Sequence, residues 1–266
     1  TEGDSNVAIG AFALDANTTA DNNVAVGRSA LGANTTGSEN IAIGRDAMLL
    51  GATGSGNLAI GYEALRTDDL GSKSTAIGYQ ALRVQDFLVA TDSNNTAVGY
   101  QSGLAVTTGV KNTLLGASSG VALTAGANNT AIGYEALSTE DGHGNNTAIG
   151  YRALKTLNAG ADGFNTAVGV DAGLSVTTGT YNNLFGHIAG DALTTGGLNT
   201  AIGSFSLTAD TQGSRSVAVG HGTLTNQNFT SATDAYNTVV GYAAGNAITT
   251  GTLNTLIGGL SGDAIT

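Results

Sequence analysis

Apolar and small polar residues recur along this chain in one short unit, which is repeated from end to end. Residues 129–133 and 146–150 both read Asn-Thr-Ala-Ile-Gly. Position three of this pentapeptide is Ala in 11 of 15 copies and Leu or Val in the rest, and position four is always Ile, Val, Leu or Phe. Neighbouring residues of a strand point to opposite faces. Each copy therefore predicts a short strand that is apolar on both faces and buried on both sides.

The glycine at position five recurs at an almost constant spacing. Of the fourteen gaps between these glycines, eleven are 17 residues, two are 21 and one is 19. Such a period predicts an all-β fold, a β-solenoid (parallel β-roll) of about fifteen 17-residue coils, forming a single domain over residues 1–266. We expect each glycine to be a structural corner, where a side chain would clash and φ is positive. The corner glycines are Gly10, Gly27, Gly44, Gly61, Gly78, Gly99, Gly116, Gly133, Gly150, Gly169, Gly186, Gly203, Gly220, Gly241 and Gly258.

A second signal follows three and four residues after each corner. It reads Ala-Leu in some coils, as at Ala136-Leu137, and small-Gly in others, as at Ala172-Gly173. A turn such as Thr177-Thr178-Gly179 then leads to the next pentapeptide. The pattern predicts a coil of two short strands and two turns.

The longer gaps mark insertions into this coil. The two 21-residue gaps match each other, with Phe87 corresponding to Phe229 and Thr91-Asp92 to Thr233-Asp234. We expect loops at one azimuth of the solenoid, a position that often carries the binding surface of a repeat protein.

Position one of the pentapeptide forms a polar row. An asparagine repeated once per coil predicts a ladder of hydrogen-bonded turns. The row is Asn6, Asn23, Asn40, Asn57, Asn95, Asn112, Asn129, Asn146, Asn165, Asn182, Asn199, Asn237 and Asn254, with Ser74 and Ser216 as substitutes.

Most tyrosines occupy one place in the repeat, directly after the corner glycine. His187 and His221 take the same place in other coils. Two interpretations stay open: a surface stripe that binds a glycan or a receptor, and a stacked ladder that stiffens the solenoid or packs against another protomer. The six tyrosines of this candidate stripe are Tyr62, Tyr79, Tyr100, Tyr134, Tyr151 and Tyr242.

Charge and composition exclude several classes of protein. The net charge is -11 and the nine basic residues are scattered, whereas nucleic-acid binding needs clustered Lys and Arg. There is no cysteine, so neither disulfides nor thiol chemistry are expected. No apolar run is long enough to span a bilayer, so we expect no direct membrane insertion.

We find no motif that predicts catalysis, a metal site or a cofactor. Calcium-binding loops, a nucleophile elbow and a phosphate-binding loop are all absent from the sequence. The carboxylates of Asp68, Asp69, Asp92, Glu140, Asp141 and Asp234 are interpreted as solvated loop charges. His143, His187 and His221 are not at the spacing of metal ligands. The chain is therefore not expected to be an enzyme.

The run Asn-Thr-Ala-Ile-Gly-Tyr-x-Ala-Leu, as in residues 129–137 and 146–154, resembles the head repeats of trimeric autotransporter adhesins. It is equally similar to the repeat arrays of phage-type tail-fibre proteins, and the resemblance covers nearly the whole chain. It implies a left-handed parallel β-roll that trimerises, lies at a cell surface or on a virion appendage, and serves in attachment.

These observations lead to one expected function and several alternatives. We expect a non-enzymatic extracellular segment, the shaft or head of an attachment fibre, with no cofactor. A homotrimer is expected because one coil cannot bury both faces of the strand. The alternatives are a phage tail fibre, a structural filament whose subunits stack end to end, and, more remotely, an ice- or glycan-binding solenoid. The partners expected are the chain itself and a glycan or cell-surface receptor.

Overall fold

The computed structural model describes residues 3–265. Positions two to four of each pentapeptide form a strand of three residues, one per coil, and these strands pair in parallel. This confirms an all-β, parallel β-solenoid of about fifteen coils. The chain divides into two compact units, Thr1–Asn129 and Thr130–Thr266. That residues 1–266 act as a single domain stays a prediction.

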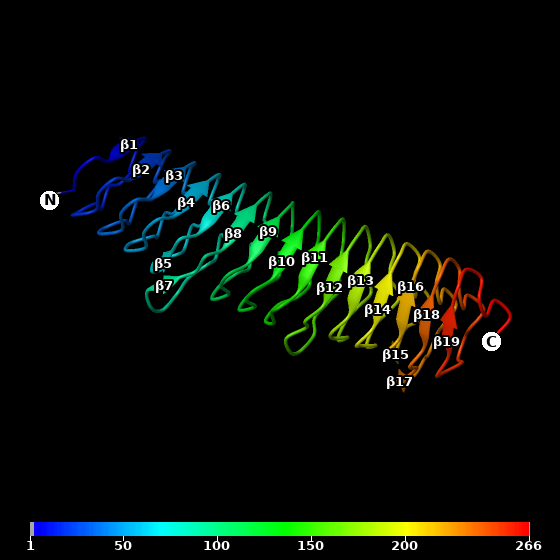
Figure 1. Ribbon diagram of the computed structural model, residues 1–266. Helices are drawn as coiled ribbons and strands as arrows, with labels where there is room; N and C mark the ends of the chain where they lie inside the picture. The colour runs from blue at the N-terminus through cyan, green and yellow to red at the C-terminus, as the bar shows by residue number, and fades with distance from the viewer. Residues whose placement is uncertain (1–2, 266) are drawn as a thin grey trace. The chain divides into compact units, whose positions relative to one another are not determined.

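In each unit the strands lie side by side and point the same way (Figure 1). Their register is exact, with position two opposite position two, as in Thr130 opposite Thr147. The first unit contains β1 (Val7–Ile9), β2 (Val24–Val26), β3 (Ile41–Ile43), β4 (Leu58–Ile60), β6 (Thr75–Ile77), β8 (Thr96–Val98) and β9 (Thr113–Leu115). The second contains β10 (Thr130–Ile132), β11 (Thr147–Ile149), β12 (Thr166–Val168), β13 (Asn183–Phe185), β14 (Thr200–Ile202), β16 (Val217–Val219), β18 (Thr238–Val240) and β19 (Thr255–Ile257).

Between residues 3 and 265 there is no helix long and apolar enough to cross a membrane.

Except in the end strands β1 and β19, the chain itself buries one face of each pentapeptide strand and leaves the other uncovered. Position three points into the core, where Ala131 and Ala148 are fully buried. Positions two and four point outward, and Ile43 and Ile202 of position four are 37% and 42% exposed. The outer face is therefore left uncovered by the single chain, as expected for one coil, because successive strands add side by side and form no second layer over it. That a partner chain covers this face stays a prediction.

The asparagine ladder is confirmed. The Oδ1 atom of Asn23 accepts a hydrogen bond of 2.9 Å from the backbone N–H of Asn40, one coil on. The Nδ2 group of Asn23 donates to the backbone carbonyl of Gly37 at 3.0 Å. The same pair of bonds recurs in most coils, so these buried amides are satisfied and each fixes the coil that follows.

Where the ladder carries serine, a glutamine completes it. A serine hydroxyl is shorter than an asparagine amide, and Gln85 fills the difference. Its Nε2 donates to the Ser74 hydroxyl at 2.8 Å, and its Oε1 accepts from Asn95 Nδ2 at 2.7 Å. Gln227 bridges Ser216 and Asn237 in the same way, at 2.9 and 2.8 Å.

No strand forms at the Ala-Leu or small-Gly signal in the described residues, so the second strand is not where it was predicted. The segment after the corner is a run of turns instead, in which the second and fourth residues after the glycine have positive φ. In one coil these are Glu135 at +52° and Leu137 at +51°, and strands require negative φ. The Leu or Gly of the second signal therefore occupies a left-handed position, where glycine is free of strain.

Leucine and glycine alternate at this position because another side chain fills the space. A Cβ atom placed on Gly103 would lie 2.7 Å from Leu114 Cδ1, and one on Gly120 would lie 2.8 Å from Leu114 Cδ2. Leu114 is at position three, where most coils have Ala. Two turns have Gly in place of Leu, and one Leu on a strand fills the core volume that their side chains would occupy. This exchange is consistent with the close packing of protein interiors.

The 21-residue gaps form two matched insertions. In the first unit β5 (Gly71–Ser72) pairs with β7 (Thr91–Asp92), and in the second β15 (Gly213–Ser214) pairs with β17 (Thr233–Asp234). The equivalent residues Phe87 and Phe229 are buried beneath them, only 5% and 6% exposed. Each insertion is therefore anchored by an aromatic side chain.

The corner glycines all have φ between +127° and +142°. Successive corners are in close contact, since a Cβ atom on Gly27 would lie 2.6 Å from the carbonyl oxygen of Gly44. A side chain at a corner therefore meets both an unfavourable φ and the backbone of the next coil.

We expect Gly133→Ala to lower the free energy of unfolding by about 1–3 kcal/mol, because Gly133 has φ of +134° and its Cβ would overlap the carbonyl of Gly150. Two glycines of the same unit separate these causes. Gly160 has φ of +69° with open space around it, and Gly142 has open space without a positive φ. Chemical denaturation should give the largest loss for Gly133→Ala, a smaller one for Gly160→Ala and the smallest for Gly142→Ala. Equal losses would contradict a special role for the corners.

We expect Leu114→Ala to cost about 2–5 kcal/mol by leaving a cavity, and Gly120→Leu to cost about 1–3 kcal/mol by overpacking the space that Leu114 occupies. The double variant Leu114→Ala/Gly120→Leu should lose less stability than the sum of the single variants, since it restores the arrangement of the Leu-containing coils. Thermal and denaturant unfolding of the four proteins test this, and strict additivity would show that the two positions do not share core volume.

Candidate functional site

The predicted tyrosine stripe forms stacked ladders. In the first unit, the ring of Tyr79 lies between the rings of Tyr62 and Tyr100, with centroid distances of 5.1 and 5.3 Å. This spacing is close to the strand separation of a β-sheet, because each ring follows a corner glycine and adjacent corners are in contact. The exact register of the strands thus carries over to the side chains outside the sheet.

The other predicted tyrosines form two further groups in the second unit. Tyr134 stacks on Tyr151 at 5.6 Å, and Tyr242 stacks on His221 at 5.5 Å. The guanidinium of Arg152 lies 4.8 Å from the centroid of Tyr151. The stripe is therefore divided into separate short ladders. The interpretation as a stacked ladder describes their geometry, and binding by the stripe stays a prediction.

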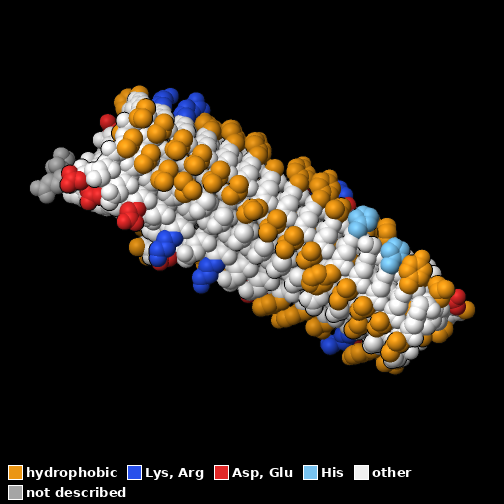
Figure 2. Space-filling model, turned by 45° about the horizontal axis from the view of Figure 1, so that its top comes forward, with side chains coloured by type: hydrophobic (Ala, Val, Ile, Leu, Met, Phe, Trp, Pro, Cys, Tyr) orange, Lys and Arg blue, Asp and Glu red, His pale blue; other side chains and the backbone are white. Residues whose placement is uncertain are grey.

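Sequence reasoning missed a second aromatic row at the opposite edge of the strands. Phe164 and Tyr181, which directly precede the asparagine of their coils, stack at 5.0 Å. Their spacing of 17 residues was the available signal. Together with position four, these rows leave many apolar side chains on the surface, and Figure 2 shows rows of hydrophobic side chains among uncharged polar ones.

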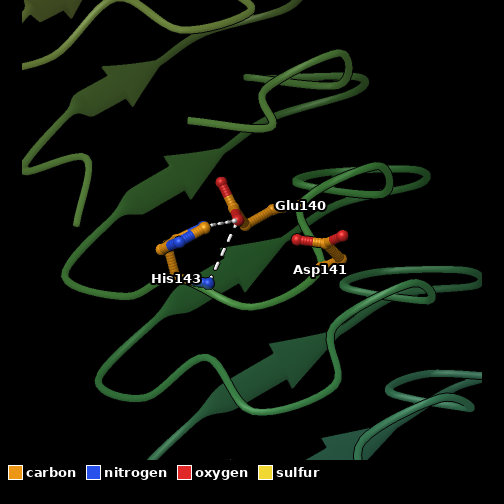
Figure 3. Close-up of side chains that lie close together, drawn as sticks. All are labelled: Glu140, Asp141 and His143. Carbon is orange, nitrogen blue, oxygen red and sulfur yellow. Dashed lines mark hydrogen bonds and ion pairs between the residues drawn. The ribbon is translucent and has the colours of Figure 1, made fainter. Parts of the chain in front are cut away.

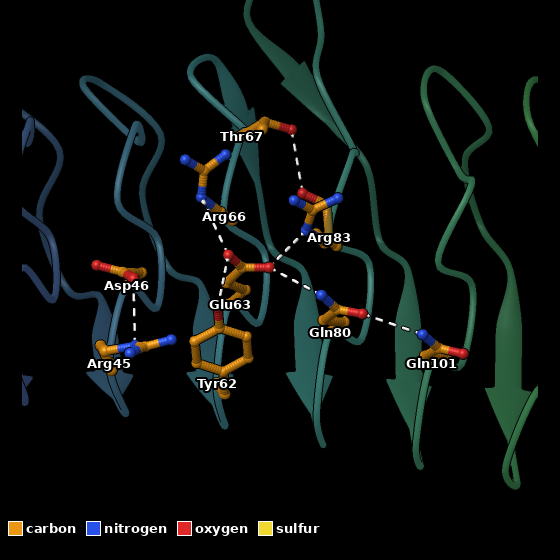
Figure 4. Close-up of polar contacts among 9 residues, drawn as sticks. All are labelled: Arg45, Asp46, Tyr62, Glu63, Arg66, Thr67, Gln80, Arg83 and Gln101. Atoms are coloured by element: carbon orange, nitrogen blue, oxygen red, sulfur yellow. Dashed lines mark hydrogen bonds and ion pairs between the residues drawn. The ribbon is translucent and has the colours of Figure 1, made fainter.

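A polar network lies beside the first tyrosine ladder (Figure 4). Glu63 accepts hydrogen bonds from Arg83 Nε at 2.6 Å and Gln80 Nε2 at 2.9 Å, and from the Tyr62 hydroxyl at 3.0 Å. Gln101 Nε2 in turn donates to Gln80 Oε1 at 3.0 Å. Burial would raise the pKa of Glu63, but these hydrogen bonds outweigh it and lower the pKa below its ordinary value. The carboxylate therefore anchors an amide ladder that runs parallel to the rings.

Two of the carboxylates interpreted as solvated loop charges are buried, so the prediction is wrong for Asp68 and Glu140. They are 1% and 0% exposed. Both stand seven residues after a corner glycine, a place filled in other coils by core residues such as Leu123 and Leu157. The other carboxylates of this set are not buried. Exposure is as predicted for Asp92, Asp141 and Asp234, and Asp69 is partly exposed.

Asp68 belongs to the hydrogen-bond network beneath the first insertion. Its Oδ1 accepts from the backbone N–H of Gly71 at 2.9 Å, and its Oδ2 accepts from Gln85 Nε2 at 2.5 Å. Asp210 accepts from Gly213 and Gln227 in the equivalent way, at 2.9 and 2.6 Å. Burial raises the pKa of Asp68 to about 6, although its hydrogen bonds with Gln85 and Gly71 act in the opposite direction.

Glu140 lies in the group most similar to a metal site (Figure 3). Glu140, Asp141 and His143 place their potential ligand atoms within 4.8 Å of one another. Both Glu140 oxygens already have partners in the chain: Oε1 lies 3.2 Å from the His143 N–H and 3.3 Å from its Nδ1, and Oε2 accepts from the Ala159 N–H at 3.2 Å. The carboxylate thus ties together two neighbouring loops, and we assign no metal to it.

The buried Asp68 predicts a pH dependence. Its pKa in the folded protein lies above the ordinary value of 3.8, so its contribution to stability is fully present below about pH 3.8 and is lost as the pH rises through about 6. A pKa shift of this size corresponds to a free-energy difference on the order of 3 kcal/mol between the protonated and charged forms of Asp68. The unfolding free energy of the wild type relative to Asp68→Asn should therefore fall by this order between about pH 3.5 and pH 7.

Chemical denaturation across this pH range measures the effect, with Asp15→Asn as a control at an exposed aspartate of the same unit. Parallel pH curves for the wild type and Asp68→Asn would contradict the prediction.

Comparison with known proteins gives no identification. No protein-family model, no curated protein and no solved structure matches this chain.

Proposed function

We propose that this chain is a non-enzymatic segment of an extracellular attachment fibre, a β-solenoid shaft or head that assembles as a homotrimer. The observation that carries the proposal is the outward row at position four of the pentapeptide. Every copy places Ile, Val, Leu or Phe there, and the chain leaves this side chain exposed or half-buried in every coil.

An uncovered row of this kind is unfavourable in water. Exposed apolar surface costs about 25 cal/mol per Å² relative to burial, and parallel sheets are usually covered on both faces. A polar residue at position four would remove the cost without disturbing the core, since the side chain points outward. Retention of an apolar residue in all fifteen copies therefore supports a second copy of the chain as the cover.

The repeat also suits a mechanical and multivalent role. Backbone hydrogen bonds and the asparagine ladder join each coil to the next within a unit, which resists bending. Insertions and turns recur on the surface, so an assembled fibre would present the same weak contact many times, and the avidities of such contacts combine. A phage tail fibre and a free structural filament share these features and differ in where the protein is found.

Immunogold electron microscopy of the cells or particles that produce the chain tests this location. Label on a cell surface or a virion appendage supports attachment, and label on free filaments supports the structural alternative. Label confined to the cell interior would contradict the proposal.

We expect Ile77→Asp/Ile149→Asp to dissociate the trimer, because three-fold assembly would bring identical charges into an apolar interface. Both residues are at position four, one in each unit. Thr139→Asp, at an exposed turn residue, is the matched control and should leave the trimer intact. Multi-angle light scattering and sedimentation equilibrium measure the assembly. A soluble, stable wild-type monomer at micromolar concentration would refute the trimer.

A further inference from the structure

Two ladders end together in the first unit. The rings of Tyr62, Tyr79 and Tyr100 stack in successive coils, and beside them the side chains of Glu63, Gln80 and Gln101 are linked by hydrogen bonds. The next coil has Ala117 and Ser118 in the corresponding places. That coil is in direct register, since the Ser118 N–H donates to the Tyr100 carbonyl at 2.9 Å. The surface therefore steps down from a Tyr-Gln pair to an Ala-Ser pair.

The step leaves one face of the Tyr100 ring bare. Among residues 3–265, Tyr79 has a ring on each side and is 43% exposed, whereas Tyr100 has a ring on one side only and is 53% exposed. The rings of Tyr79 and Tyr100 are within 11° of parallel, so the free face of Tyr100 is turned toward the coil of Ala117. The residue in register on that side is Ala117, whose methyl group is too small to cover an aromatic ring.

Neutral polar groups border this face. In the described hydrogen bonds, Gln101 uses its Nε2 to reach Gln80, while its Oε1 accepts none and ends the amide ladder. Ser118 adds a hydroxyl in the next coil and is half-buried. No charged side chain occupies either place, so the site offers one flat π face together with an amide oxygen and a hydroxyl group.

We propose that the bare face of Tyr100, with Gln101 and Ser118, binds a pyranose ring of a carbohydrate. A pyranose of the galactose type turns several C–H bonds toward one face, and these partly positive hydrogens match the negative face of a tyrosine ring. Its hydroxyl groups lie around the edge of the ring, where they can donate to Gln101 Oε1 and exchange hydrogen bonds with Ser118. A neutral sugar fits better than a charged ligand, for which the site has no counter-charge.

The second unit repeats the arrangement at Tyr242. Its ring stacks on His221 at 5.5 Å and 13°, and the next coil has Gly259 in the equivalent place. Tyr242 is 63% exposed, the most of the six tyrosines in the predicted stripe. Ladder ends at which a small residue follows an aromatic one, as at Tyr100 and Tyr242, thus offer a free ring face. Rings inside a ladder offer only their edges.

The proposal rests on the attachment function and names its ligand as carbohydrate. The test is a saturation-transfer difference NMR titration of methyl β-D-galactopyranoside against the full chain. All proteins carry Tyr242→Ala, so that the bare ring of Tyr242 does not contribute. We expect saturation of the sugar C–H protons, and about tenfold weaker binding for Tyr100→Ala, since an aromatic contact of this kind contributes about that factor.

Ala117→Leu provides the sharper variant, because it leaves Tyr100 in place and covers its free face with an aliphatic side chain. It should abolish the saturation while leaving the unfolding temperature unchanged or higher. Tyr236→Ala is the control at a tyrosine of similar exposure, 50%, on the opposite strand edge, and it should bind as the parent does.

Three results would overturn the proposal: no saturation of the galactoside by the parent protein, unchanged binding in Ala117→Leu, or equal saturation of the acyclic polyol sorbitol. Light scattering on the same samples separates this site from the proposed function. A trimer that fails to bind the galactoside removes the carbohydrate site alone, whereas a monomer removes the proposed assembly and leaves the binding result to stand by itself.

Discussion

The buried asparagine ladder sets the geometry on which the rest of each unit depends. A buried amide left without partners costs about 1–3 kcal/mol, and Asn40 has its partners only when the coils on either side stand in exact register. A slip of one residue would leave such amides unpaired in every coil at once. Longer coils must therefore place their extra residues outside the ladder, as the insertion before Asn95 does with the help of Gln85.

Exact register has consequences on the outer surface. Because equivalent residues stand one above another, any residue type that recurs in the sequence becomes a continuous row. Position four becomes an apolar row that is favourable only when covered, which is the basis for the proposed trimer. The residue after the corner becomes a stack of tyrosines that ends wherever the sequence has a small residue, as at Ala117. Interruptions in a row can therefore define individual sites on a surface that is otherwise repetitive.

The interior shows how the coil tolerates variation at a constant cross-section. Leu114 on a strand replaces leucines at two neighbouring turns, and Asp68 and Glu140 occupy a place filled elsewhere by leucine. The carboxylates are accepted because nearby backbone N–H groups and side-chain donors satisfy them: Gly71 and Gln85 for Asp68, and His143 and Ala159 for Glu140. Each holds a loop in place, and for Asp68 the cost of burying the charge varies with pH.

The sequence alone determined the coil, its length, the corners and the asparagine ladder, because each follows from a residue type repeated at a fixed spacing. It also predicted that the tyrosines would align. It could not show that the Ala-Leu segment is a left-handed turn, since Leu137 is unusual at positive φ and only its surroundings hold it there.

Nor could the sequence show which side chains, or which face of an aromatic ring, the rest of the chain covers. The side chain at position four is exposed in the single chain because no second layer forms over the outer face of the sheet. Asp68 lies inward because its place in the coil points to the core, although its neighbours in sequence are polar. The free face of Tyr100 depends on a residue 17 positions away. These features were decided by the tertiary structure, because burial is set by contacts between coils and not by the residues adjacent along the chain.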